Sequence, residues 1–374
     1  MQYGCLIFIL LIIIVGNAAA FNNEEYAYAV RFPDTYSSPT LVRINLESEK
    51  FTDVAKVPEM SSFMTIDGKG DVLIPQHIGI DTLGKTVEKY FAHNCKVKQI
   101  IKNRGDGPLW AIPYKDDIYV ILYFSEDQPN QPPQHHSTSI EKYRLANGNY
   151  QFTEEIDLGE GTYFVPSSMD VDREHARLII ATSFLMPSVD KYSQILLSMV
   201  SLDTGKLVAQ KRLRECAGVY AVAVANDDKV YIGATYKSCA KKDEGEVNLC
   251  DYLCVYDAGS LAFIKKVPVG PKLVRRLVYA PDEKKLYAGY DGTRLHRRPG
   301  LTVIDCRTDK VIKDIKFERF DRMEYVGKHK LLVTGRVAGE TERFCLYVID
   351  TQKDEIVRKV PGMYRLISKN LTDW

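Results

Sequence analysis

The chain has 374 residues, of which 45% are hydrophobic and 26% are charged, and its formal net charge is +1 at pH 7. Such a near balance of charge excludes a whole-protein electrostatic attraction to nucleic acid or to an anionic membrane surface. A chain of this length normally forms two domains, unless it is built from repeats that bury their faces against one another.

The N-terminal segment has the pattern of a secretory signal peptide. An apolar run over residues 5–15 is followed by alanines at 18–20, as before a cleavage site. The run is too short to cross a bilayer, which takes about 20 residues. We therefore predict that residues 1–20 are removed and that 21–374 form a single secreted, soluble domain. An uncleaved anchor is the alternative, because no Lys or Arg precedes the apolar run.

From residue 26 onwards the chain consists of short β-strand patterns. Alternating runs rich in Val, Ile, Tyr and Leu recur, whereas apolar residues at helical spacing are rare. The clearest unit, 274–315, contains four such runs, with turns at Pro281-Asp282 and around Arg307 to Asp309. The third run of this unit has counterparts along the whole chain. The copies are Leu41–Asn45, Glu88–Asn94, Ile140–Leu145, Met199–Asp203, Leu253–Asp257, Leu301–Asp305 and Leu346–Asp350.

Seven copies at a spacing of about 50 residues predict seven four-stranded units, and hence an all-β, seven-bladed β-propeller. Two strands are left over at the ends, Tyr26 to Phe32 and Met363 to Ser368. We predict that the C-terminal strand becomes the innermost strand of the blade that the N-terminal strand begins. This pairing closes the ring and hides two sheet edges. Removing the chain after Pro361 is therefore expected to damage the whole fold.

The repeat itself resembles a known family. The pattern Val-Ile-Asp305-x-x-Thr-x-Lys-Val-Ile, with an Ala-Pro-Asp-x-x-x-Leu-Tyr turn, is similar to the YVTN-type propeller repeat of surface and secreted proteins. The broader group includes lactonase-like and quinoprotein-like propellers. The resemblance spans 26–370, is clear from Met199 to Asp350 and is degenerate in the first three units. It implies the fold and leaves the function open, because this architecture carries both binding proteins and enzymes.

Four connections between second and third strands are long, and in a propeller these share one face with the blade-to-blade connections. They are Ser125 to Ser137, Ser183 to Gln194, Lys237 to Asp251 and Asp291 to Gly300. Loops on a rigid framework usually carry recognition, so we predict that this face binds a partner. The alternative is that the insertions are tolerated without a function.

Two of these connections contain candidate functional residues. Cys239 and Cys250 flank a charged segment, and in an exported protein we expect a disulfide between them, worth about 2–3 kcal/mol. Pairing of Cys254 with either of them is the alternative. In the fourth connection, Arg297 and Arg298 are candidates for docking sulfate, phosphate or an acidic glycan, against the alternative of a solvated charged loop.

The histidines and cysteines of the sequence do not indicate a metal site or a reactive thiol. The adjacent pair His135-His136 lies in the first long connection, and two histidines are too few for zinc, which takes three or four ligands. Eight cysteines less Cys5 leave seven in the mature chain, so at least one thiol remains outside any internal pairing. We predict neither a bound metal nor a cofactor.

The innermost strands line the central channel, and their alignment on the turns suggests what it contains. The aligned residues are Ser62, Leu109, Ser167, Ala221, Arg276, Asp321 or Arg322, and Tyr364. A calcium-dependent lactonase-like site needs several converging oxygen ligands, and Asp321 is the one carboxylate among them. Arg276 and Arg322 are instead candidates for an anion pocket at the channel mouth, against the alternative of solvated arginines, and the alignment is fixed to within one residue.

No motif of a serine hydrolase, zinc protease or nucleotide-binding loop is present in the sequence, and no catalytic residue is assigned. Asn370 begins an Asn-Leu-Thr glycosylation sequon near the C-terminus. The interpretation we favour is a secreted, monomeric, non-enzymatic propeller that binds an extracellular protein or glycan, and neither nucleic acid nor membrane. The alternative is a propeller hydrolase or oxidoreductase that acts on a small anionic substrate at the channel mouth.

Overall fold

The computed structural model describes the chain between residues 26 and 366 in separate ranges. These are 26–32, 40–45, 48, 50–56, 65–67, 71–78, 83–90, 97–104, 106–124, 139–158, 164–184, 195–213, 216–225, 228–236, 250–291, 299–317, 319–327, 329–336, 345–361 and 363–366. Every regular element within these ranges is a β-strand, and none of them holds a helix long and apolar enough to span a membrane.

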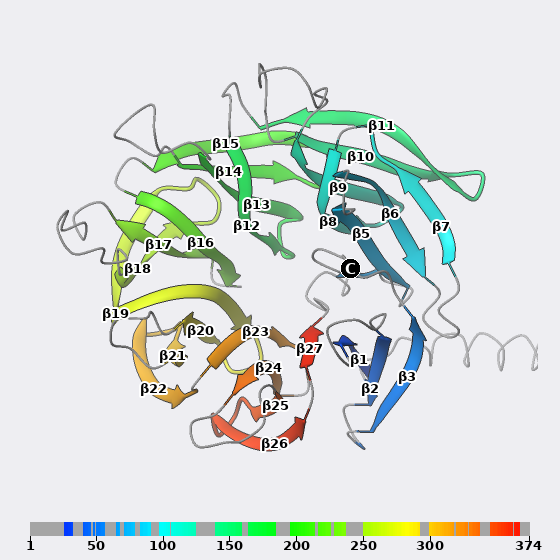
Figure 1. Cartoon of the computed structure of the whole chain (residues 1–374). Coiled ribbons are helices and arrows are strands. Elements are labelled where there is room, and N and C mark those ends of the chain that lie inside the picture. The colour runs from blue at the N-terminus through cyan, green and yellow to red at the C-terminus, as the bar shows by residue number, and fades with distance from the viewer. Residues whose placement is uncertain are drawn as a thin grey trace, which may run out of the picture.

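The strands form seven antiparallel four-stranded blades around a common axis, as predicted (Figure 1). The strands of each blade are given from the axis outwards. Blade 1 consists of β27 (Met363–Leu366), β1 (Tyr26–Phe32), β2 (Thr40–Asn45) and β3 (Phe51–Lys56), and blade 2 of β4 (Thr65–Ile66), β5 (Val72–Ile78), β6 (Leu83–Tyr90) and β7 (Val97–Lys102). Blade 3 consists of β8 (Asp106–Tyr114), β9 (Asp117–Phe124), β10 (Ser139–Ala146) and β11 (Asn149–Asp157), and blade 4 of β12 (Phe164–Asp172), β13 (Arg177–Phe184), β14 (Ile195–Ser201) and β15 (Lys206–Leu213). Blade 5 consists of β16 (Cys216–Ala225), β17 (Lys229–Tyr236), β18 (Cys250–Asp257) and the first part of β19 (Phe263–Ala280). Blade 6 consists of the second part of β19, β20 (Lys285–Asp291), β21 (Gly300–Asp305) and β22 (Lys310–Lys316), and blade 7 of β23 (Arg319–Tyr325), β24 (Lys330–Arg336), β25 (Cys345–Asp350) and β26 (Glu355–Pro361).

One long strand, β19, belongs to two blades. Up to Lys272 it pairs with β18 as the outermost strand of blade 5, and from Leu273 it pairs with β20 as the innermost strand of blade 6. Blades 5 and 6 therefore form one continuous hydrogen-bonded sheet.

The ring closes in the way the sequence predicts. Strand β27 pairs with β1, so that Leu366 lies opposite Ala29 and Met363 opposite Phe32. The two strands, at opposite ends of the colour scale in Figure 1, make up the inner half of blade 1. The fold thus depends on a contact between the two ends of the chain.

The seven third strands hold the cores between blades, which explains why they repeat most visibly. In β14, β21 and β25 nearly every residue is buried, because both sheet faces pack against neighbouring blades. The aspartate that ends several copies has a structural role. Asp305 accepts the backbone N–H of Arg307 at 2.9 Å, and Asp350 accepts those of Gln352 and Lys353, so each carboxylate shapes the following turn.

In blades 4 to 7, the two tight turns are tied together on one face of the ring. The first-to-second-strand turn places one residue at positive φ, such as Ala176 at 50° and His329 at 57°. The carbonyl of that residue accepts an N–H from the third-to-fourth-strand turn of the same blade, at 2.8 Å from Leu202 and at 2.8 Å from Thr351. The side chains on these turns are therefore held in fixed positions.

Neighbouring blades are joined by buried tyrosine–aspartate hydrogen bonds near the same face. The Tyr231 hydroxyl of blade 5 donates to Asp309 of blade 6, and the Tyr287 hydroxyl of blade 6 donates to Asp354 of blade 7, each at 2.5 Å. Burial opposes ionisation of Asp309, but hydrogen bonds from Lys265 and Tyr231 outweigh it and hold the pKa of that carboxyl below its ordinary value. These contacts give the ring polar links between blades in addition to its apolar cores.

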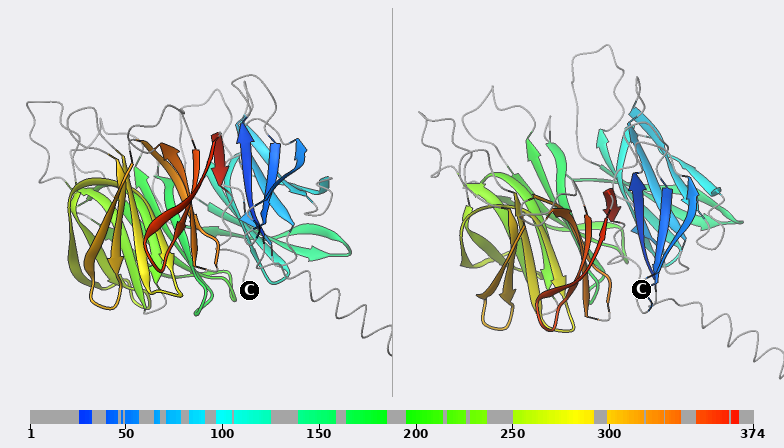
Figure 2. Two further views of the ribbon diagram at one scale, coloured as in Figure 1. Left: turned by 90° about the horizontal axis from the view of Figure 1, so that it is seen from below. Right: turned by 60° about the horizontal axis from the view of Figure 1, so that its bottom comes forward.

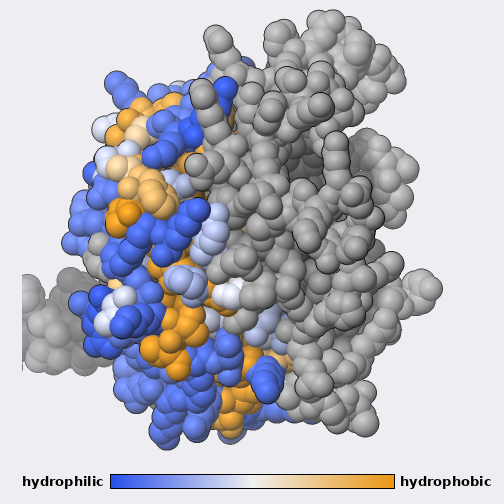
Figure 3. Space-filling view, turned by 90° about the vertical axis from the view of Figure 1, so that its left-hand side faces the viewer, coloured by the Kyte–Doolittle hydropathy of each residue, from blue (hydrophilic) through white to orange (hydrophobic). Residues whose placement is uncertain are grey.

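The outermost strands of blades 4 to 7 each expose a pair of adjacent apolar residues near the beginning of the strand. The pairs are Leu207-Val208, Phe263-Ile264, Val311-Ile312 and Ile356-Val357. Radial blades diverge outwards, so both faces of the fourth strand reach the surface. Apolar patches alternate with hydrophilic ones on the side of the molecule shown in Figure 3. Lysines on the same strands discourage edge-to-edge pairing with another chain.

Candidate functional site

The two faces of the ring differ in their connections. Turns between first and second strands and between third and fourth strands lie on one face, here called the turn face (Figure 2). Connections between second and third strands leave from the opposite face, here called the loop face. All four predicted long connections therefore leave the loop face, from the ends of β9, β13, β17 and β20. The strands extend slightly into the predicted loops, since β18 begins at Cys250 and β20 ends at Asp291.

The innermost strands of blades 3 to 7 each contain a β-bulge at the same height, near the loop face. The register shifts place the extra residue at Leu109, Ser167, Tyr220, Arg275 and Asp321. The residues that the sequence alignment placed along the channel coincide with this extra residue in blades 3 and 4, and in blade 7 one of its two alternatives, Asp321, does. In blades 5 and 6 the structure moves it one residue earlier, from Ala221 to Tyr220 and from Arg276 to Arg275. Ala221 itself is 2% exposed and belongs to the apolar core.

Arginines gather at this level on two neighbouring inner strands. The Arg275 guanidinium lies 4.5 Å from the centre of the Tyr220 ring, a cation–π distance. Arg276 and Arg322 are partly exposed, and Asp321 on the bulge of β23 is exposed. Three arginines and one aspartate therefore lie at this level of the two strands, and guanidinium groups are suited to pairing with an anionic ligand.

The backbone around Asp321 is fixed by a buried threonine. Thr334 Oγ1, on β24, accepts the N–H of Arg322 at 3.2 Å and lies 3.5 Å from Asp321 Oδ2. Thr334 is 2% exposed, so its hydroxyl anchors the bulge from inside the blade. The position of Arg322 therefore depends on the rigid blade and not on a loop.

Several candidates from the sequence lie outside the described residues. They are Ser62, His135, His136, Cys239, Arg297, Arg298 and Asn370. The Cys239–Cys250 disulfide consequently stays a prediction. Its competitor Cys254 is a buried thiol, 3% exposed in the core between blades 4 and 5.

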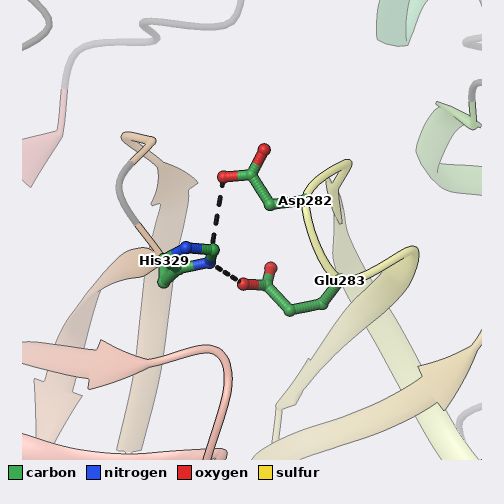
Figure 4. A group of neighbouring side chains, drawn as sticks. All are labelled: Asp282, Glu283 and His329. Atoms are coloured by element: carbon green, nitrogen blue, oxygen red, sulfur yellow. Dashed lines mark hydrogen bonds and ion pairs between the residues drawn. The ribbon is translucent and has the colours of Figure 1, made fainter.

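The structure also brings together a group that the sequence analysis did not predict. Asp282 and Glu283, on the turn between β19 and β20, meet His329, on the turn between β23 and β24 (Figure 4). His329 Nδ1 is hydrogen-bonded to Glu283 Oε1 and lies 3.9 Å from Asp282 Oδ2. The hydrogen bond to Glu283 raises the pKa of His329 above its ordinary value. The Tyr325 hydroxyl donates to Asp282 and orients that carboxylate.

Comparison with known proteins supports the propeller fold and does not indicate a function. No protein-family model matches the sequence, and no curated protein matches it either. Among solved structures, the periplasmic gluconolactonase PpgL of Pseudomonas aeruginosa superposes with a TM-score of 0.61 at 13% identity, covering 91% of this chain and 99% of that one. The chain shares the propeller fold with it.

Two further structures give the same result. Hydrazine synthase of Kuenenia stuttgartiensis has a TM-score of 0.59 at 12% identity, covering 83% of this chain and 89% of that chain. The propeller domain of Cps50 (Swd1) from Myceliophteria thermophila has a TM-score of 0.57 at 11% identity, with 87% and 93% covered. At such low identity these likenesses concern the architecture alone.

Proposed function

We propose that this chain is a secreted, non-enzymatic β-propeller that binds an extracellular protein or glycan through its loop face. The observation that carries the proposal is the asymmetry of the ring. In blades 4 to 7 the described part of the turn face consists of short turns tied to one another, whereas four long connections leave the loop face from rigid strands. The signal-peptide pattern and the resemblance to the YVTN-type repeat of surface proteins support export.

The charges near the axis favour an acidic partner. Arg275, Arg276 and Arg322 lie at the loop-face end of two inner strands, and Arg297 and Arg298 follow in the connection after β20. Carboxylate and sulfate groups pair well with guanidinium groups, often through two hydrogen bonds. An acidic glycan is therefore the partner we would test first.

The experiment measures binding of the mature chain to immobilised heparin and polygalacturonate, with neutral dextran as the control surface. In the first variant, an Asn-Gly turn replaces residues 237–249 and Cys250 becomes Ser. The register of Ile232 opposite Cys254 brings Tyr236 opposite residue 250, which suits a two-residue hairpin. The second variant is Arg276→Gln with Arg322→Gln. We expect a loss of affinity of about 10-fold in each, equivalent to about 1.4 kcal/mol.

The proposal requires that folded variants bind less. If both variants keep the wild-type melting temperature and bind both acidic glycans as tightly as the wild type, the loop face is not the glycan-binding surface. If the wild type binds neither glycan above dextran, the acidic-glycan version of the proposal is wrong.

A second candidate function rests on the same arginines. Their partial exposure on β19 and β23 also suits a hydrolase or oxidoreductase that orients a small anionic substrate. Turnover of a panel of lactones and sugar acids, with EDTA and with added calcium, tests this alternative. Unchanged turnover in Arg276→Ala with Arg322→Ala would remove its support.

A further inference from the structure

The group Asp282, Glu283 and His329 lies on the turn face, away from the proposed partner site. Two of its members belong to the first turn of blade 6, and the third belongs to the first turn of blade 7. Both turns are fixed by backbone hydrogen bonds from the third-to-fourth-strand turn of their own blade, at 2.9 Å to the Lys284 carbonyl and 2.8 Å to that of His329. The group thus bridges two blades from two rigid turns.

Glu283 carries a buried oxygen with no hydrogen-bond donor. Its side chain is 8% exposed, and its Oε2 has no hydrogen-bond partner although Oε1 is bonded to His329. A buried carboxylate oxygen without a donor is costly, and each such atom in a native structure calls for an explanation. In Figure 4 this second oxygen lies on the side of Asp282, where a cation between the three side chains would meet it.

The three side chains are almost close enough to share one ion. One ligand atom from each lies within 4.8 Å of the others. Tetrahedral zinc with bonds of 2.0–2.1 Å places its ligand atoms about 3.3 Å apart. The 3.9 Å between His329 Nδ1 and Asp282 Oδ2 must therefore shorten by about 0.6 Å, while the hydrogen-bonded His329–Glu283 pair must open slightly.

We propose that Asp282, Glu283 and His329 form a binding site for a divalent transition-metal ion, with zinc as the expected ion. One imidazole nitrogen and two carboxylates suit zinc better than calcium or magnesium, which prefer oxygen ligands throughout. Water completes the coordination. Coordination by Glu283 Oε2 gives this buried oxygen a positively charged partner, and the shared ion links blade 6 to blade 7 at the turn face. Within the described ranges no other group of three such side chains comes as close together.

The chain provides a matched control at another blade junction. His175, on the first turn of blade 4, lies 3.0 Å from Asp172 Oδ2 and 3.6 Å from Asp228 Oδ1 of blade 5. It is a histidine between carboxylates on the same face, but Asp172 already accepts the His175 backbone N–H. Changing His175 therefore tests whether any histidine–carboxylate contact on this face binds metal.

The experiment is isothermal titration of the metal-free mature chain with ZnCl₂, repeated with CaCl₂ and MgCl₂. The variants are Glu283→Gln, His329→Asn and the control His175→Gln. Asn tolerates positive φ, so His329→Asn keeps the turn. A chain carrying His135→Ala and His136→Ala excludes binding at that histidine pair. We expect one zinc ion per chain, an affinity at least about 10-fold weaker in Glu283→Gln and His329→Asn, and wild-type affinity in the two control chains.

Cobalt gives a second readout that does not depend on stability. Co²⁺ bound to the wild type should show visible absorption that His329→Asn alters and His175→Gln leaves unchanged. The proposal is overturned if the metal-free chain takes up no stoichiometric zinc. It is also overturned if both site variants bind zinc within twofold of the wild type, or if His175→Gln weakens binding as much as they do.

Discussion

The buried link between blades 6 and 7 allows a quantitative test of what holds the ring together. Tyr287 is fully buried, and its hydroxyl donates to Asp354 at 2.5 Å. Lys285 lies 2.8 Å from the other oxygen of Asp354 and donates to the Thr351 carbonyl at 2.7 Å. The two perturbations are Tyr287→Phe, which removes one hydroxyl and keeps the ring, and Lys285→Met, which removes the charge.

The expected magnitudes differ because the partner left behind differs. Tyr287→Phe loses a hydrogen bond to a charged group but leaves Asp354 paired with Lys285, at a cost of about 2 kcal/mol. Lys285→Met removes the positive charge beside Asp354, whose side chain is 8% exposed, and leaves the Tyr287 hydroxyl in place. We expect this to cost about 3–5 kcal/mol, because the buried carboxylate loses its charged partner. The double variant should cost more than the sum, because the buried carboxylate then loses both.

Thermal unfolding measures these costs. With an unfolding entropy of about 2.1 cal/mol/K per residue, 1 kcal/mol corresponds to about 1.3 °C in a chain of 374 residues. We therefore expect Tm to fall by about 3 °C in Tyr287→Phe and by about 5 °C in Lys285→Met. Tyr252→Phe is the control, since the exposed Tyr252–Lys266 contact should contribute less than about 0.5 kcal/mol. Equal Tm values for Tyr287→Phe and Tyr252→Phe would refute the idea that the buried link stabilises the ring.

Three further predictions concern other parts of the ring. Ending the chain at Pro361 removes β27 from β1, so about four backbone hydrogen bonds are lost and Tm should fall by more than about 5 °C, as read by circular dichroism. Burial raises the pKa of Asp170 to about 6, above its unfolded value near 3.9, so the stability linked to this group is full below about pH 3.9 and is lost as the pH rises through 6. Asp170→Asn should remove this step of about 3 kcal/mol from a plot of Tm against pH. Gly289→Ala places a Cβ against the Phe320 ring and should cost about 1–3 kcal/mol in denaturant unfolding, less when Phe320→Leu is present.

Each of these predictions has a control. A chain ending at Leu366 keeps β27 and should melt like the full-length protein, so an equal loss there would argue against closure by β27. Parallel Tm profiles of wild type and Asp170→Asn between pH 4 and pH 7 would exclude the assigned titration. Gly259→Ala is the control for Gly289→Ala, because the nearest atom to its new Cβ is the end of the Asp257 side chain at 3.3 Å.

The repeat made most of the fold predictable from the sequence. The segments Leu301 to Asp305 and Leu346 to Asp350 are mostly apolar on both faces because they pack between blades. The aspartate at the end of each segment shapes the turn that follows. This pattern recurs along the chain, so the sequence predicts both the seven units and the closing strand. The first two blades are harder to predict because their innermost strands are short, with β4 spanning Thr65–Ile66 and β27 spanning Met363–Leu366.

The candidate sites were predicted less completely, for two physical reasons. A β-bulge adds one residue to the inner strand, and with Arg275 next to Arg276 and Tyr220 next to Ala221 the sequence does not indicate which residue is the extra one. The turn-face group joins Asp282 to His329 across two blades, and a histidine considered alone gives no signal. Aligning the first turns of successive blades would have found it, since His175 meets Asp228 across the corresponding junction.

The most direct test of the proposed loop-face function is hydrogen–deuterium exchange of the mature chain with and without a heparin oligosaccharide. Binding at the loop face should protect residues 237–249 and 292–298 and the loop-face ends of β19 and β23, around Arg276 and Arg322. Exchange at the turns 281–284 and 326–329 should stay unchanged. Protection confined to those turns, or to the outer strands, would contradict binding at the loop face and place the partner on another surface.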